Sequence, residues 1–446
     1  MLKKFLITLL IALGYLFGAF GGTRSGAVAN VAEAAELVRV ALVAGQATAE
    51  VSCDSEFEVQ SGALKTVLPK GKYFLHIVDD SLVLDKAGAS DAQQFTFTST
   101  LYLNALEGKA LPKVNQRSYR GYLRALATKS KLLVINYIDI EDYLASVLPA
   151  KTMVVWPDEG IKAQAVAARS YVLHACRANS NQQYDLLAMD KELPYEGTGP
   201  RIEKAGVTKL LKATSGQYLV DSYGAPINAV TTSSSGGRTE SAANAWGREV
   251  SYLASVEDYD SDSPDYTWEY RATPVLLEGQ LAQRGYTVGK LNSVRLSPLN
   301  EPDADRTPTG RVRYVIITGA NGSAKLSAEE LAEIIGLKST LFDIETGTPP
   351  PETLKVPIED RYGFEVGSKD IDIKLKEDER PVWSKLLKSY HMLSGGKEEK
   401  LIFHGRGKGS GLGLSAWGAR GMCIANEKIS YREILAHYYP GTRLVN

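Results

Sequence analysis

The sequence has little cysteine: three in 446 residues, far apart at Cys53, Cys176 and Cys423. Such a sparse, odd-numbered set excludes a disulfide framework and a cysteine-rich zinc or iron–sulfur site. Beyond residue 20 there is no long apolar run, which excludes a protein with many membrane spans. Charge of one sign is also missing, because 51 basic residues face 52 acidic ones. No overall basic field therefore argues for a nucleic-acid partner.

What is present is ordinary for a folded protein. Hydrophobic residues make up 44% and charged residues 23% of the chain, which rules out disorder over its whole length. A length of 446 residues exceeds the usual size of one domain. We therefore expect one large elaborated domain or two to three packed units.

The N-terminal segment predicts export. Lys3 and Lys4 precede an apolar stretch from Phe5 to Phe20, and Ala27-Val28-Ala29 follows as a small-residue cleavage pattern. Residues 1–29 are thus predicted to be a signal peptide or an N-terminal membrane anchor, and their length leaves cleavage or retention open. The body of the protein is expected to be extracytoplasmic, either secreted or held at the cytoplasmic membrane by this segment alone.

Strands and helices are both predicted, which indicates the α+β class. Residues 38–43, 73–78 and 131–135 run apolar or alternate, as strands do. The clearest helix covers 157–178, with a proline and two acids in its first turn. Its apolar face at helical spacing places Arg169 off that face. The face consists of Ile161, Ala165, Ala168, Val172 and Ala175.

Two further stretches stand out. Residues 345–400 hold three consecutive prolines and a charged run, which is typical of an insertion or linker. Residues 405–413 alternate glycine with other residues, but fit neither a dinucleotide fingerprint nor a phosphate-binding P-loop. The following Gly413-Leu414-Ser415-Ala416-Trp417 lacks the final glycine of a serine-hydrolase elbow. Because metal-ligand spacings are also missing, we expect no cofactor and no metal.

Three segments in order resemble the stage II sporulation protein D family (SpoIID/LytB). With a weaker match at Tyr119-Arg120-Gly121, the resemblance covers about residues 38–446, so that 38–344 and 401–446 are predicted to form the domain of this family. The segments are Glu141–Leu144 through Trp156-Pro157 to Lys162–Tyr171, then Ser233–Gly237 with Trp246-Gly247 and Tyr252-Leu253, and finally Gly405–Ser415 with Trp417–Ala419 and Tyr431–Thr442.

The resemblance implies a bacterial envelope protein. Studied members of the family are lytic transglycosylases that cut peptidoglycan glycan strands, notably during endospore engulfment, and others are described as modifiers of cell-wall amidases. Such cleavage needs a carboxylic acid that protonates the leaving oxygen. The family places this glutamate just before a Met-Pro and five residues ahead of the tryptophan, where this sequence has Lys151.

Other positions depart from the family in the same way. The family's Gly-His-Gly is Gly409-Ser410-Gly411 here, and the glutamine after Ser415 is Ala416. Some members hold zinc through an Asp-x-Cys-x-x-x-His segment, but Asp185–Lys191 has neither the cysteine nor the histidine. The scaffold is retained while its chemistry is lost, which favours a catalytically impaired, glycan-binding homologue.

Three hypotheses follow from these residues. The first is a glycan-binding protein that works beside a cell-wall hydrolase or amidase. The second is an active lytic transglycosylase that uses another carboxylate, Glu159 first and Asp158 next. The third is an envelope scaffold without affinity for glycan. Cations and hydroxyls suit sugar hydroxyls and peptide carboxylates, so the predicted substrate-binding residues are Arg169, Ser233, Ser234, Ser235, Arg406, Lys408, Ser410 and Ser415.

Overall fold

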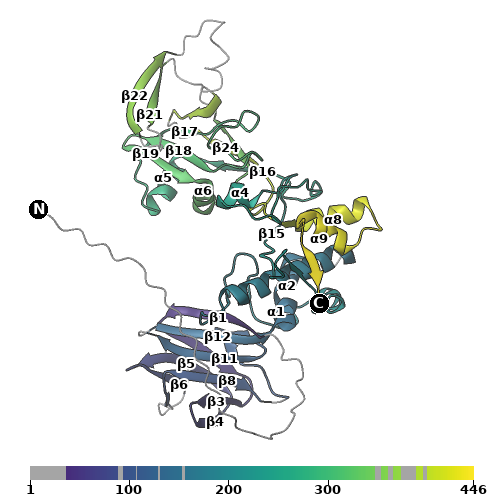
Figure 1. Cartoon of the computed structure of the whole chain (residues 1–446). Coiled ribbons are helices and arrows are strands. Elements are labelled where there is room, and N and C mark those ends of the chain that lie inside the picture. The colour runs from purple at the N-terminus through teal and green to yellow at the C-terminus, as the bar shows by residue number, and fades with distance from the viewer. Residues whose placement is uncertain are drawn as a thin grey trace, which may run out of the picture. The chain divides into compact units, whose positions relative to one another are not determined.

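The computed structural model describes residues 37–88, 94–106, 108–128, 131–152, 156–346, 353–359, 365–372, 388–394 and 399–446. The predicted signal or anchor segment, residues 1–29, lies outside this part. Within it, no helix combines the length and the apolar character that crossing a membrane requires. The strands form several sheets, and the helices lie between them in the chain, which confirms the α+β class (Figure 1).

The N-terminal part is built from two sheets over a common core, and their strands pair antiparallel except β13, which runs parallel to β1. Alternation along the strands decides which side chains face that core, as in β5 (Gly71–Val78), where Tyr73 and Leu75 are buried and Phe74 is exposed. The seven-stranded sheet has the order β13-β1-β12-β11-β8-β3-β4, and the six-stranded sheet has the order β10-β9-β2-β5-β6-β7. The other bounds are β1 (Leu37–Gln46), β2 (Thr48–Cys53), β3 (Phe57–Ser61), β4 (Leu64–Leu68), β6 (Ser81–Lys86), β7 (Gln94–Phe97), β8 (Thr100–Ala105), β9 (Lys113–Val114), β10 (Arg117–Ser118), β11 (Tyr122–Thr128), β12 (Lys131–Asp139) and β13 (Leu186–Leu187).

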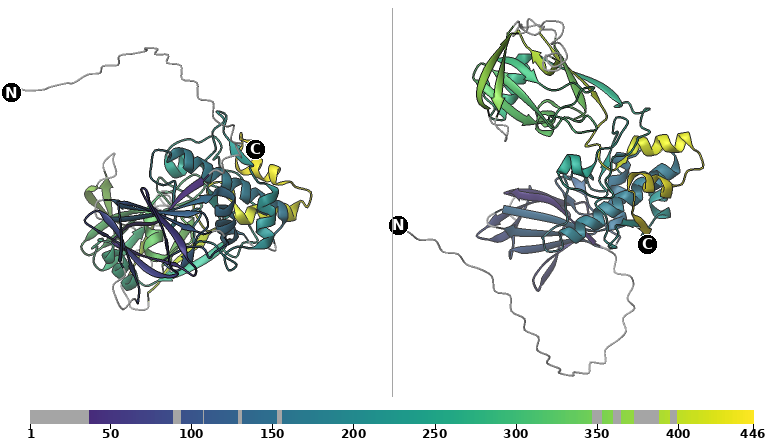
Figure 2. Two further views of the ribbon diagram at one scale, coloured as in Figure 1. Left: turned by 90° about the horizontal axis from the view of Figure 1, so that it is seen from below. Right: turned by 45° about the horizontal axis from the view of Figure 1, so that its top comes forward.

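A group of helices follows, with α2 (Asp158–Ala178) at its centre, which confirms the helix predicted for 157–178. All five residues of the predicted apolar face are buried. The small side chains of α2 let its neighbours approach closely, and the C-terminal helices lie against it in both views of Figure 2. The neighbours are α1 (Ile140–Lys151), α3 (Ala205–Ala213), α8 (Ala416–Ala425) and α9 (Tyr431–Tyr438).

Residues 267–406 supply a second strand-rich region with its own hydrophobic core. It holds a three-stranded sheet, β16-β24-β20, and a four-stranded sheet, β19-β18-β17-β23. Ser327 caps α6 (Ala328–Ile335), since its hydroxyl accepts the amide of Glu330. The other bounds are β16 (Thr267–Ala272), α5 (Pro274–Gln283), β17 (Leu291–Arg295), β18 (Tyr314–Gly319), β19 (Gly322–Ser327), β20 (Phe342–Thr346), β23 (Tyr390–Met392) and β24 (Leu401–Arg406).

The stretch predicted as an insertion or linker, 345–400, contributes strands to these sheets at both of its ends. The last residues of β20 pair with β24, and β23 pairs with β17. Between them, β21 (Thr353–Glu359) and β22 (Glu365–Asp372) form an antiparallel hairpin. The two ends of this stretch therefore belong to the sheets, although its composition resembles that of an insertion or linker.

Candidate functional site

Two segments far apart in the sequence meet beside the helices. β15 (Thr231–Thr232) pairs in parallel with β25 (Leu414–Ser415), and a further bridge joins Ser234 to Lys408. The contact is close because Gly407 has a φ of +71° and no side chain: a Cβ there would lie 2.6 Å from the Ser234 carbonyl oxygen. The serine- and glycine-rich turn, 231–237, therefore lies along the glycine-rich run, 405–415.

A cavity of about 230 Å³ opens where these segments reach α1 and α2. Polar and small apolar side chains share its wall, and six stretches of the sequence contribute to it. The lining residues are Leu148, Ala150 and Lys151 from α1, Gln164, Ala168 and Tyr171 from α2, Glu192 and Leu193, Ala229 and Thr231–Ser233, Lys408, and Ala416. We call this the α1 cavity.

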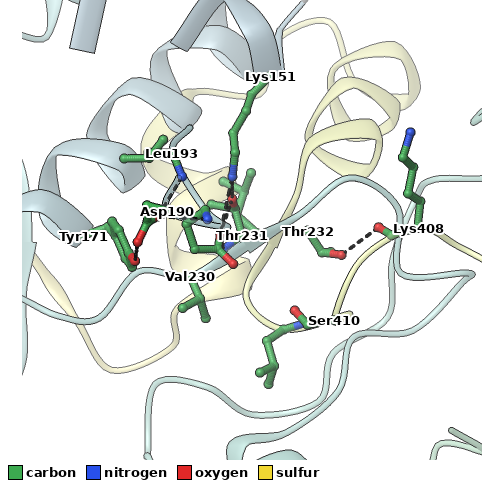
Figure 3. A network of polar contacts seen from close by, with 12 residues as sticks. Lys151, Tyr171, Asp190, Leu193, Val230, Thr231, Thr232, Lys408 and Ser410 are labelled. Atoms are coloured by element: carbon green, nitrogen blue, oxygen red, sulfur yellow. Dashed lines mark hydrogen bonds and ion pairs between the residues drawn. The ribbon is translucent and has the colours of Figure 1, made fainter. Parts of the chain in front are cut away.

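Lys151 is the last residue of α1, where the helix dipole favours a cation. Asp139 begins this helix by accepting the amide of Glu141 at 2.8 Å. The Lys151 ammonium reaches into the α1 cavity and donates to the Thr231 hydroxyl at 2.7 Å (Figure 3). It also lies 3.3 Å from a carboxylate oxygen of Glu192. The lysine at the family's acid position thus lies beside the two segments that meet here.

Glu192 is the one carboxylate that lines the α1 cavity within the described ranges. The same oxygen that faces Lys151 accepts the Thr231 amide at 3.0 Å and its hydroxyl at 3.1 Å. Sequence reasoning missed Glu192, and no motif or spacing in the sequence marks it. Its place depends on Asp190, one of whose oxygens accepts the amides of Glu192 and Leu193, both at 2.9 Å.

Asp190 also joins this loop to α2. Its second oxygen accepts the Tyr171 hydroxyl at 3.0 Å (Figure 3). Burial and the nearby Asp190 charge raise the pKa of Tyr171 above its ordinary value. Tyr171 therefore stays a neutral donor on the wall of the cavity.

Glu159, the predicted alternative acid, does not line the α1 cavity. One of its oxygens pairs with Lys162 at 2.6 Å, and the other accepts the amide of Tyr431 at 2.7 Å. It therefore links the start of α2 to the start of α9. Asp158 beside it is likewise not among the lining residues.

Arg169 is buried, although the sequence placed it off the apolar face of α2. Only 1% of the residue is exposed, and the two oxygens of Glu141 take its Nε and Nη2 at 2.7 and 2.9 Å. Its Nη1 donates to the Gln217 carbonyl at 2.8 Å. These contacts do not support the predicted role in substrate binding, because no face of the guanidinium remains for a ligand.

The three serines of the turn have different surroundings. Ser233 lines the α1 cavity, whereas Ser234 and Ser235 are fully buried. The Ser234 hydroxyl donates to Asp260 and that of Ser235 donates to Asp258, both at 2.5 Å. Burial and the charge of Asp260 raise the pKa of the Asp258 carboxyl. The prediction of ligand contacts for Ser234 and Ser235 therefore finds no support in their positions.

The predicted residues of the glycine-rich run also divide. Lys408 is exposed and lines the α1 cavity, while Arg406 is exposed in another cleft. The exposed Ser410 accepts the Leu412 amide at 3.3 Å and lines neither space. Ser415 is buried and caps α8 by accepting the Gly418 amide at 3.1 Å. Ser415 thus has a structural position.

The zinc positions of the resembled family hold Leu187 and Lys191, which do not suit zinc. Leu187 is apolar and 44% exposed, and Lys191 pairs with Glu333. Within the described ranges, no three histidine, cysteine or acidic side chains lie together so as to hold a metal ion. The loop is instead ordered by the contacts of Asp190 with Tyr171, Glu192 and Leu193.

Comparison with known proteins identifies relatives over much of the chain. An uncharacterized protein of Brachyspira hyodysenteriae is 25% identical over 75% of this chain and 74% of its own length. The amidase enhancer of Bacillus subtilis is 25% identical over 68% of the chain, and stage II sporulation protein D of Bacillus amyloliquefaciens is 28% identical over 47%.

The matched part spans only 40% of the amidase enhancer and 61% of that stage II sporulation protein D. The family model described as stage II sporulation protein matches residues 128–220, a range that includes α1, α2, Lys151 and Glu192. Together these matches support membership of the chain in the stage II sporulation protein (SpoIID) family, most directly over residues 128–220.

Proposed function

We propose that this protein binds peptidoglycan glycan strands in the α1 cavity during cell-wall remodelling, and that it is catalytically impaired. The names of its relatives, stage II sporulation protein D and amidase enhancer, support a cell-wall-associated role related to sporulation. The finer proposal depends on the chemistry of the cavity. In the same proposal the protein works outside the cytoplasmic membrane, where the N-terminal segment would direct it.

The observation that carries the proposal is the position of Lys151. Its ammonium has three donors, and contacts with Thr231 and Glu192 use two of them. The remaining donor can bind a sugar oxygen. An ammonium group is ordinarily a much weaker acid than a carboxylic acid, and it is therefore poorly suited to protonate a leaving oxygen. A lysine at this position thus supports binding better than cleavage.

The rest of the wall suits a carbohydrate. Thr231, Thr232, Tyr171 and Lys408 line the same space, and the Lys408 ammonium lies 3.6 Å from a carboxylate oxygen of Asp265. Such groups recognise sugar hydroxyls and carboxylates. The volume of about 230 Å³ lies just below the range of about 300–1,000 Å³ for small-molecule sites. It therefore suits one sugar residue of a longer strand.

A sacculus assay that measures binding and cleavage together tests this proposal. The wild-type protein should co-sediment with purified peptidoglycan sacculi and release no anhydro-muropeptides. The Lys151→Met variant should bind more weakly, whereas Lys191→Met, an exposed lysine outside the cavity, should bind like the wild type. Wild-type protein that stays in the supernatant would favour the scaffold hypothesis instead.

A second candidate function is cleavage by Glu192, favoured by its position as the carboxylate of the cavity. It requires that wild-type protein release anhydro-muropeptides and that Glu192→Gln abolish the release. Glu159→Gln serves as a control, because its carboxylate does not line the cavity. The same assay thus separates a binding protein from a cutting enzyme.

The Lys151→Glu variant tests whether the α1 cavity can still support cleavage when a carboxylate returns to this position. The new carboxylate would lie near Glu192, and two neighbouring carboxylates raise the pKa of one of them, as a general acid requires. We expect trace cleavage from this variant. A folded but inactive Lys151→Glu would indicate that Ser410 and Ala416, the other altered positions, also matter.

The proposed partner is a cell-wall amidase or hydrolase, in line with the name of one relative, the amidase enhancer. The protein would hold the strand while the partner cuts. Addition of the wild-type protein should raise the rate at which a purified cell-wall amidase digests sacculi. Lys151→Met should raise it less if glycan binding is the means.

A further inference from the structure

A second cleft lies on the other side of the turn that borders the α1 cavity. Its volume is about 430 Å³. Gly236 and Gly237 of the turn line it, and Arg406 is two residues before the cavity residue Lys408. The other lining residues are Arg238, Tyr266, Leu299, Pro302, Pro308, Thr309, Gly310 and Leu341. We call this the arginine cleft.

Its two guanidinium groups are available to a ligand. Arg238 and Arg406 are exposed, and neither side chain has a hydrogen bond or ion pair to any residue that the structure describes. Nearby Arg306 and Arg311 differ, because they are buried and bind Asp343 and the Ser235 carbonyl. None of the described residues that line the cleft carries a carboxylate, so these residues do not neutralise the two arginines.

The remaining walls select among anions. Tyr266, Pro302, Pro308, Leu299 and Leu341 provide apolar surface around the two arginines. A planar guanidinium binds a carboxylate through two parallel hydrogen bonds. Apolar walls suit the aliphatic side chains of a short peptide, whereas a polyol phosphate chain would leave them unused. A short peptide with a free carboxylate therefore fits both features.

The two spaces are close enough to hold one ligand. Arg406 and Lys408 are two positions apart in the chain, a step that spans at most about 7 Å. On the other strand, Ser233 lines the α1 cavity and Gly236 lines the arginine cleft. We propose that the arginine cleft binds the carboxylate-bearing peptide attached to the glycan strand, an inference that rests on the proposed binding of the strand in the α1 cavity.

Binding of soluble peptidoglycan fragments to the full chain tests the proposal. The probes are a glycan oligosaccharide with its peptides and the same oligosaccharide without them. We expect the wild type to bind the peptide-bearing form about tenfold more tightly, as one charged hydrogen-bonded contact allows. Arg238→Gln/Arg406→Gln should remove this preference and leave affinity for the bare glycan unchanged. Arg284→Gln, an exposed arginine outside both spaces, should keep the preference.

Each outcome is decisive. Equal wild-type affinity for the two forms would overturn the arginine cleft while the proposed function stands, and a preference that survives in the double variant would do the same. Binding of neither form would overturn both proposals. In a competition assay, the free peptide should displace the peptide-bearing oligosaccharide better than a glycerol phosphate polymer does. Equal competition by the polymer would overturn the assignment to a peptide. Thermal melting of each variant verifies that it is folded.

Discussion

The two ends of α1 each carry a charged pair, and the pairs differ in what surrounds them. At the start, Glu141, whose side chain is 28% exposed, meets Arg169, whose side chain is only 2% exposed. At the end, Lys151 meets Glu192, with 25% and 22% of the two side chains exposed. The first pair uses Nε, Nη1 and Nη2 of a buried guanidinium and ties α1, α2 and the Gln217 carbonyl together. The second pair lies at the α1 cavity, and its ammonium has one N–H donor that neither Thr231 nor Glu192 uses. The first pair therefore stabilises the fold, whereas the second can also contact a ligand.

Removal of Arg169 should have the largest effect on stability. Arg169→Ala leaves the partly exposed Glu141 carboxylate and the Gln217 carbonyl without their partner, which should cost about 2–3 kcal/mol. Denaturant unfolding followed by circular dichroism measures this loss. Arg177→Ala, exposed near the end of the same helix, should lose less than about 1 kcal/mol. Equal losses of stability in these two variants would mean that the contacts of Arg169 with α1 add nothing beyond an exposed arginine.

Lys151→Met should show the opposite balance. Its pair is partly exposed, so the free energy of unfolding should change by less than about 1 kcal/mol. Affinity for sacculi should fall about tenfold, which corresponds to about 1.4 kcal/mol. Co-sedimentation at several protein concentrations gives the affinity, and the same unfolding assay gives the stability. A large loss of stability with unchanged affinity would make Lys151 a second structural cation.

Asp258 sharpens the comparison, because it is buried with hydroxyl and amide donors and without an ion-pair partner in the described ranges. Its pKa is raised by burial and by Asp260. The folded state therefore binds this proton more tightly than the unfolded state, and stability increases as the pH falls through the folded pKa. The wild type should gain stability relative to Asp258→Asn between pH 7 and pH 4.5, by at most about 1.4 kcal/mol per pH unit. Paired urea titrations measure the difference, and a relative gain toward high pH would contradict it.

The smallest effect compares two serines of the glycine-rich run. Ser415→Ala removes the buried cap of α8 and should cost about 1 kcal/mol. Ser410→Ala is exposed and should stay within about 0.5 kcal/mol. Thermal unfolding of both variants distinguishes the two positions. Equal melting temperatures would mean that the α8 cap contributes nothing measurable.

Several features followed from the sequence alone. Local patterns predicted the α+β class and the central helix with its apolar face, because hydrophobic periodicity and helix-start signals depend on neighbouring residues. The order of three motifs predicted the family, and the matches bear it out. Lys151 could be singled out because its position is defined by the residues around it in the chain.

Only the tertiary structure decided how the polar residues divide. Glu192 and Thr231 join Lys151 across 41 and 80 positions of sequence, and no local signal encodes that meeting. Arg169 was predicted for the ligand and lies in the core, because Glu141 compensates a charge that helical periodicity would leave in water. Ser233, Ser234 and Ser235 are alike in sequence, yet the packing of Asp258 and Asp260 beneath the turn buries two of them and leaves one on the cavity wall. A polar side chain's role depends on what the fold places opposite it, and that lies outside the reach of spacing and composition.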